Sequence, residues 1–134
     1  MPKRTTFITR IYTFDAAHQL NGHEGKCANL HGHTYRLEVT ISGPIITKTF
    51  LSSHGMVMDY AHLDNIVKPL LADKYDHRFL NDTVNVRTTA ENVAEQIGLD
   101  IKAALQDRGL PQKLELIKLW ETPNACASVD FSDD

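Results

Sequence analysis

Two strand-like segments open this sequence and two close it, with helical segments between them. The strand-like segments alternate apolar with polar residues and are rich in β-branched and aromatic side chains. They cover residues 7–14, 34–42, 113–122 and 125–131. A chain of 134 residues has the length of one domain. The order therefore predicts a single α+β domain over residues 1–134, with a four-stranded antiparallel sheet and two helices.

Two helices are predicted in the middle of the chain. Asp59 can cap the first, whose apolar residues recur at helical spacing: Leu63, Ile66, Val67, Leu70 and Leu71. Pro69 lacks the backbone donor that a helix interior requires, so it predicts a kink or an early end. Thr88 or Thr89 can cap the second helix, which ends at Gly109. Its apolar stripe comprises Val93, Ala94, Ile97, Ile101, Ala104 and Leu105.

The sheet edges and the composition limit the kinds of partner. A small sheet with unpaired edges tends to be extended by a neighbouring subunit, which favours a homo-oligomer. Fourteen Lys and Arg against seventeen Asp and Glu give a net charge of -3, with no basic block that would attract nucleic acid. No apolar run approaches the ~20 residues that span a membrane, and residues 1–6 lack the apolar core of a signal peptide. Two cysteines are too few for a disulfide framework, so we expect a cytoplasmic protein.

Histidine is the residue type that points to chemistry. His18, His31 and His33 fall within sixteen residues, in and beside the connection at residues 15–32. Residues two apart in a strand point to the same face, so His31 and His33 can converge on one ion, with His18 as a third ligand. Three imidazoles without a fourth protein ligand are typical of catalytic zinc. The alternative, separate surface or packed histidines, is weakened by the third histidine and the nearby Cys27.

The pair His31 and His33, followed by Glu38 and Gly43, also imitates the first metal motif of cupins, which are all-β jelly rolls. However, Glu38 lies at an odd offset from His33 within one strand, which places it on the opposite face. The two helical segments have no place in a jelly roll. The cupin interpretation is therefore set aside.

Cys27 lies four residues before His31, and its role stays open. It could be a fourth ligand, a small buried hydrophobe, or a nucleophile or base beside the metal. A thiol next to a zinc ion is readily deprotonated, which would make it a usable proton acceptor. Asp76 and His77, after the first helix, are its best candidate partners, although from sequence alone a polar helix end, with histidine favourable to the helix dipole, is the commoner explanation of such a pair.

Glu121 ends the third strand at the edge of an apolar face, which favours a role in recognition. A solvated strand-end glutamate is the alternative. Thr89 and Glu91 open the second helix, where capping explains them without any ligand.

Six motifs, in this order, carry a resemblance to a known family. They are residues 14–18 (FDAAH), 27–33 (CANLHGH), 56–60 (MVMDY), 76–81 (DHRFLN), 88–92 (TTAEN) and 121–122 (ET). The set resembles the 6-pyruvoyltetrahydropterin synthase and 6-carboxytetrahydropterin synthase family, small zinc enzymes with the tunnelling fold. The resemblance covers nearly the whole chain.

This resemblance implies specific roles. It implies zinc on His18, His31 and His33, a catalytic triad of Cys27, Asp76 and His77, and a pterin anchor at Glu121. Family members assemble so that sheets from several subunits close a barrel, which implies a hexamer or tetramer with active sites between subunits. The stretch from Thr89 to Glu91 would then lie near the pterin of a neighbouring chain.

The resemblance also implies an activity. The three residues between Cys27 and His31 look like those of the 6-carboxytetrahydropterin synthase type, from the queuosine and deazapurine pathway. The implied reaction converts 7,8-dihydroneopterin triphosphate to 6-carboxytetrahydropterin, acetaldehyde and triphosphate, with zinc on the side-chain hydroxyls and Cys27 moving protons through His77. The alternatives are a pyruvoyl-forming synthase of a tetrahydrobiopterin-type pathway and a zinc- or pterin-binding protein without turnover.

Overall fold

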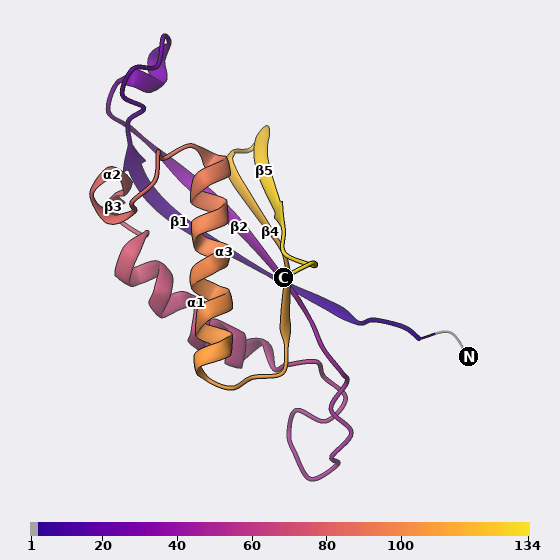
Figure 1. Ribbon diagram of the computed structural model, residues 1–134. Coiled ribbons are helices and arrows are strands. Elements are labelled where there is room, and N and C mark those ends of the chain that lie inside the picture. The colour runs from indigo at the N-terminus through magenta and orange to yellow at the C-terminus, as the bar shows by residue number, and fades with distance from the viewer. Residues whose placement is uncertain (1–2) are drawn as a thin grey trace.

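The computed structural model describes residues 3–134, and Met1 and Pro2, the first residues of the predicted domain, lie outside this range. In chain order the elements are β1 (Phe7–His18), the 3₁₀ turn η1 (Lys26–Ala28), β2 (His31–Ser42), α1 (Tyr60–Lys74), β3 (Arg78–Phe79), α2 (Leu80–Thr83), α3 (Ala90–Asp107), β4 (Lys113–Thr122) and β5 (Ala125–Asp130). Figure 1 shows α1 and α3 lying across one side of a long, twisted sheet. The α+β class predicted from the sequence is confirmed.

The sheet has the strand order β3-β1-β2-β4-β5. β1 and β2 pair antiparallel along their whole length, from Phe7 opposite Ser42 to His18 opposite His31. β4 pairs antiparallel with β2, and β5 pairs antiparallel with β4. β1 and β2 are longer than predicted because their pairing continues through residues 15–18 and 31–33, where it overrides the weak strand propensity of aspartate, alanine and glycine.

The predicted numbers of strands and helices need a correction. β3 has two residues and runs parallel to β1, with Arg78 beside Ala16 and Phe79 beside Ala17. α2 follows it as a single helical turn. The described residues thus form five strands and three helices in place of the four and two predicted. The two additional elements are too short for a hydrophobic period to reveal them.

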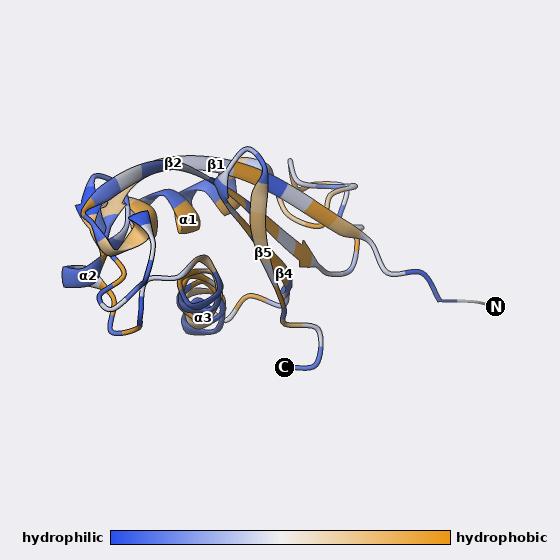
Figure 2. Ribbon diagram, turned by 90° about the horizontal axis from the view of Figure 1, so that it is seen from above, coloured by the Kyte–Doolittle hydropathy of each residue, from blue (hydrophilic) through white to orange (hydrophobic). Residues whose placement is uncertain are grey.

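The core lies between the sheet and the two long helices. Seen from above, the sheet forms one curved layer, and α1 and α3 form a second layer on one side of it (Figure 2). Leu37, Val39 and Ile41 of β2 are fully buried under this helix layer. Ile97 and Ile101 of α3 are fully buried as well. Because side chains alternate along a strand, the odd-numbered residues of β2 face the helices and the even-numbered residues face away.

α1 begins as predicted but does not end early. Its N-cap is Asp59, whose side chain accepts a hydrogen bond from the backbone N–H of Ala61 at 2.9 Å. The early end that Pro69 predicted is wrong, since the helix continues to Lys74. Pro69 removes the partner of the Asn65 carbonyl, and both residues are exposed, so water can satisfy that carbonyl.

α3 begins after Thr89, whose hydroxyl accepts a hydrogen bond from the backbone N–H of Asn92. Between the two predicted caps, the structure therefore selects Thr89. The helix ends at Asp107, and Gly109 follows with a positive φ of 63°, which glycine adopts without steric cost. Thr88 is buried and does not cap the helix.

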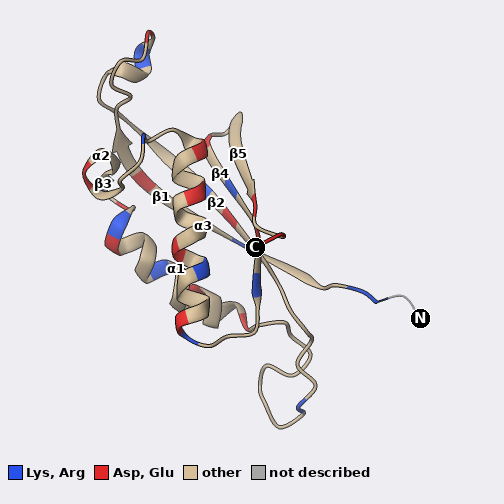
Figure 3. Ribbon diagram, in the orientation of Figure 1, with Lys and Arg blue, Asp and Glu red and all other residues tan. Residues whose placement is uncertain are grey.

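The surface of the described residues carries both signs of charge, with acidic and basic positions interspersed over helices and strands (Figure 3). Within residues 3–134, β5 pairs only with β4, and β1 has a second neighbour only at the short β3. Most of both outer strand edges is therefore open.

Over residues 3–134, none of the helices combines the length and the apolar character that a membrane crossing requires.

Candidate functional site

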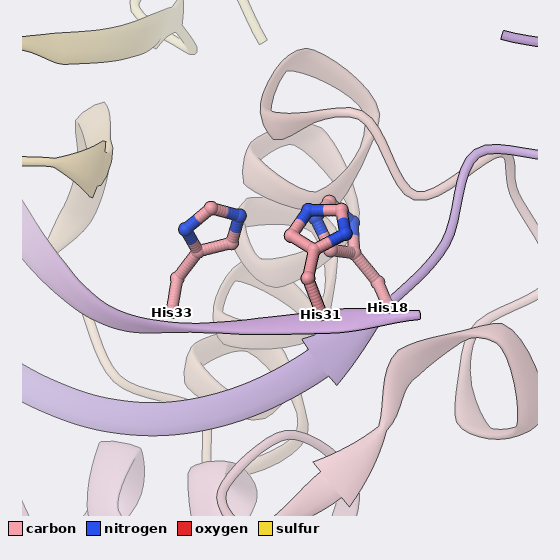
Figure 4. Close-up of side chains that lie close together, drawn as sticks. All are labelled: His18, His31 and His33. Atoms are coloured by element: carbon pink, nitrogen blue, oxygen red, sulfur yellow. The ribbon is translucent and has the colours of Figure 1, made fainter. Parts of the chain in front are cut away.

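Three imidazoles meet where β1 ends and β2 begins. His18 is the last residue of β1 and lies directly opposite His31 in the strand register. His33, two residues further along β2, points to the same face, and the three rings gather above the strands (Figure 4). One ring nitrogen from each residue lies within 4.8 Å of the others. This spacing allows all three nitrogens to bind a single ion.

The hydrogen bonds of these rings leave the converging nitrogens free. Nδ1 of His18 donates to the carbonyl of Thr88 at 2.8 Å, and Nδ1 of His31 donates to the carbonyl of Asn29 at 2.7 Å. A neutral imidazole with its proton on Nδ1 carries a lone pair on Nε2. Among the described residues 3–134, the buried Nε2 atoms of His18, His31 and His33 have no hydrogen-bond partner. Buried polar atoms are rarely left unpaired, so this donor set fits a metal ion.

The surroundings of His33 favour the form that binds a metal. Burial lowers the pKa of its imidazole below the ordinary value. The Glu121 carboxylate acts in the opposite direction, and His18 and His31 reinforce the lowering. Near neutral pH this shift favours the neutral ring, whose lone pair can ligate.

Glu121 lies at the rim of the histidine cluster. One carboxylate oxygen is 3.8 Å from Nε2 of His18, and the other is 3.8 Å from Nε2 of His33. Its side chain is 24% exposed, so it is not a freely solvated strand end. Glu121 also lines a cavity of about 380 Å³ together with Thr89 and Glu91. The structure thus brings these three predicted residues together within one chain, whereas the resemblance placed Thr89 and Glu91 beside a neighbouring chain's pterin.

A second cluster forms beside β1. Nδ1 of His77 donates to Oδ1 of Asp76 at 2.9 Å, which orients the imidazole. The backbone of Asp15 holds both residues: its N–H donates to the Asp76 carboxylate at 3.0 Å, and its carbonyl accepts the His77 N–H at 2.6 Å. His77 has a positive φ of 58°, a conformation that is uncommon for residues other than glycine. These contacts hold it in that conformation.

Sequence reasoning singled out Asp76 and His77 but missed Asp15. The carboxylate of Asp15 accepts a hydrogen bond from the hydroxyl of Thr34, and it belongs to the same cluster as Asp76 and His77. A signal was present, because Asp15 lies within the FDAAH motif at residues 14–18. Its contact with residue 77 depends on the parallel pairing of β3, which the sequence did not reveal.

The two clusters are separate within one chain. Asp15 and Thr34 alternate with His18 and His33 along their strands, so their side chains point to the opposite face of the sheet. The imidazole of His77 is 78% exposed and lines a cavity of about 570 Å³ with Asp15 and Thr34, which His33 also borders.

Cys27 belongs to neither cluster. It lies half-buried in η1 as a free thiol, and its carbonyl accepts the N–H of Leu20 at 2.7 Å. Over residues 3–134, the clusters that could hold a metal contain His18, His31 and His33 in one case and Asp15, Asp76 and His77 in the other. One chain therefore does not bring the three members of the predicted triad into contact.

Comparison with known proteins gives a consistent result. The family described as 6-pyruvoyl tetrahydropterin synthase matches residues 7–131. A 6-carboxy-5,6,7,8-tetrahydropterin synthase from Haemophilus influenzae is 37% identical over 139 residues, which covers 88% of this chain and 94% of the relative. The protein of the same description from Synechocystis is 38% identical over 120 residues, covering 90% and 89%.

Solved structures agree with this match. The structure of Caenorhabditis elegans 6-pyruvoyl tetrahydropterin synthase superposes with a TM-score of 0.77 at 27% identity, covering 95% of this chain and 96% of that chain. The resemblance carried by the six sequence motifs is thereby confirmed, together with the tunnelling fold. This chain belongs to the 6-pyruvoyl tetrahydropterin synthase family.

Proposed function

We propose that this protein is a zinc-dependent 6-carboxy-5,6,7,8-tetrahydropterin synthase. It would convert 7,8-dihydroneopterin triphosphate to 6-carboxytetrahydropterin, acetaldehyde and triphosphate. The observation that carries the proposal is the group of three buried imidazole nitrogens that have no partner among residues 3–134 and lie beside Glu121, whose side chain also lines a cavity. The names of the Haemophilus and Synechocystis relatives support the carboxy-forming product.

Zinc is the metal that this donor set favours. His18, His31 and His33 would hold it, since three imidazoles with an open fourth position are typical of catalytic zinc sites. When bound there, zinc supplies a Lewis acid that makes coordinated oxygens easier to deprotonate. The Nδ1 contacts of His18 and His31 with backbone carbonyls fix the ring orientation that this role requires.

Glu121 is the proposed anchor of the pterin ring. A pterin presents a ring N–H beside an exocyclic amino group, and a carboxylate offers two acceptor oxygens at matching separation. The cavity of about 380 Å³ that Glu121 lines with Thr89 and Glu91 is within the usual size range of small-molecule sites. Because Glu121 also borders the histidines, a pterin ring bound to its carboxylate would place the substrate's side chain beside the three imidazoles.

Cys27, His77 and Asp76 are the proposed proton-transfer residues. Because His77 donates its Nδ1 proton to Asp76, its Nε2 is free to accept a proton. The Cys27 thiolate would take the proton from the side-chain carbon of the substrate, and Cys27 and His77 would exchange that proton between them. Cys27 and His77 are apart within one chain, so a second copy must supply one of them.

This requirement supports a homo-oligomer with active sites between subunits. The open outer edges of β1 and β5 can pair with each other in neighbouring copies and close several sheets into a barrel. A hexamer or a tetramer would pair the open sheet edges and would complete the active site with a residue from a second copy.

One incubation tests the proposal. Purified, zinc-loaded protein is mixed with 7,8-dihydroneopterin triphosphate, and the pterin product is identified by its mass while triphosphate and acetaldehyde are assayed. The carboxy product with acetaldehyde is the expected result. A pyruvoyl product would identify the other synthase of the family. Pterin binding without triphosphate release would identify a binding protein.

A further inference from the structure

The C-terminal end of β1, at His18, is supported by a side chain that lies outside the sheet. β3 pairs with β1 only at Ala16 and Ala17, because the chain then turns into α2. The parallel ladder therefore stops one residue before His18. The backbone N–H and carbonyl of Gln19, which follow on the same side of β1 as β3, are nevertheless hydrogen-bonded.

The side chain of Asn81 provides that pairing. The backbone N–H of Gln19 donates to Oδ1 of Asn81 at 3.0 Å, and Nδ2 of Asn81 donates to the carbonyl of Gln19 at 2.8 Å. A carboxamide carries the same donor and acceptor as a peptide group. Asn81 thus substitutes for the next residue of the missing strand, and it fixes the backbone immediately after His18.

The same contact continues to the imidazole through Thr88. The buried Thr88 hydroxyl lies 3.4 Å from Oδ1 of Asn81 and 3.5 Å from the carbonyl of Gln19, and it can donate to either. It also lies 3.3 Å from Nδ1 of His18, whose proton goes to the carbonyl of Thr88 at 2.8 Å. Asn81, Thr88 and His18 therefore form one hydrogen-bonded unit that holds both the backbone and the ring.

We propose that Asn81 is a positioning residue of the metal centre. It keeps the end of β1 in place, so that Nε2 of His18 stays directed at the position shared with His31 and His33. The inference rests on the proposed function in one respect, namely that a metal binds those nitrogens. Asn81 lies in the DHRFLN motif at residues 76–81 and takes no part in the proposed proton transfer or pterin binding.

Zinc affinity is the first measurement. The native protein and the variants Asn81→Ala and Asn81→Asp compete for zinc with a chromophoric chelator. Asn81→Ala should weaken zinc binding by about 10–100-fold, the range found when the partners of metal ligands are removed. Asn81→Asp is isosteric but sets an acceptor against the Gln19 carbonyl, so it should also weaken binding and serves if the alanine variant does not fold. Asn65→Ala, at an exposed position of α1, should match the native affinity.

Backbone hydrogen exchange is the second measurement, and it does not depend on metal. In Asn81→Ala the Gln19 amide should exchange much faster than in the native protein. The Leu20 amide is an internal reference, since its partner is the Cys27 carbonyl. Unchanged zinc affinity of a folded Asn81 variant, or unchanged Gln19 exchange, would overturn the inference. A native protein that took up no zinc would instead refute the proposed function, and Gln19 exchange would still decide whether Asn81 holds the strand end.

Discussion

Replacing Gly98 with alanine tests how closely α3 lies on the sheet that carries the histidines. A Cβ atom at this position would lie 2.3 Å from two ring atoms of Phe131 and 3.1 Å from Cγ1 of Ile117. The ring cannot move outward freely, because Phe131 is only 3% exposed and belongs to the core. Gly98 is therefore a packing residue, although glycine is unfavourable in a helix interior.

Two opposing effects set the magnitude. Overpacking of this kind costs about 1–3 kcal/mol, whereas exchanging a helical glycine for alanine stabilises by about 1 kcal/mol. Gly98→Ala should thus lower the free energy of unfolding by up to about 2 kcal/mol. In a Phe131→Leu background the two ring atoms are absent and the 3.1 Å contact with Ile117 remains, so the same exchange should stabilise by up to about 1 kcal/mol. The coupling energy between the two sites should be about 1–3 kcal/mol.

Urea unfolding of the four proteins of this cycle measures the coupling. All are compared at one protein concentration, because the stability of an oligomer depends on concentration. Ala103→Gly, at an exposed position of the same helix, calibrates the propensity effect. If Gly98→Ala changed stability equally in both backgrounds, the contact with Phe131 would cost nothing and the reasoning would be refuted.

Four further predictions concern the site and the fold. His33→Ala should lose most of its zinc by elemental analysis, and full zinc content would contradict the ligand set. Cys27→Ala should keep zinc but lose about 10²–10⁴-fold in turnover. Mixing Cys27→Ala subunits with His77→Ala subunits should restore some activity, because each variant still supplies the residue that the other lacks. The absence of recovery in verified mixed oligomers would exclude a shared site. Glu121→Gln should weaken a non-reacting pterin by more than ~1 kcal/mol in calorimetric titration, because a donor then faces a donor; equal affinity would remove Glu121 as the anchor. The hydrogen bond from Arg10 lowers the pKa of Asp64 in the folded protein. The stabilisation by this hydrogen bond is therefore present above the pKa that Asp64 has in the unfolded chain, and it is lost as the pH falls through its pKa in the folded protein. Asp64→Asn should therefore be less stable than the native protein to urea at neutral pH and equal to it in acid, and a pH-independent difference would contradict this.

The sequence determined those features that depend on local periodicity. Alternation over residues 34–42 predicted β2, and the two-residue spacing of His31 and His33 placed both rings on one face, since successive side chains of a strand point to opposite sides. The stripe of α3 and the four antiparallel strands were visible for the same reason. The six motifs added the family, because their order and spacing are specific even where each motif is short.

Tertiary structure decided the features that join distant parts of the chain. No local pattern predicts that the backbone of Asp15 holds His77 in a left-handed conformation, or that Asn81 pairs with Gln19 across 62 residues. Glu121 shows the same limit: it could be placed on an apolar strand face, but only packing brought its carboxylate within 3.8 Å of His33. Periodicity specifies which way a side chain points relative to its own strand. Which distant group it then meets depends on strand order and register, and these are set by the burial of the whole core.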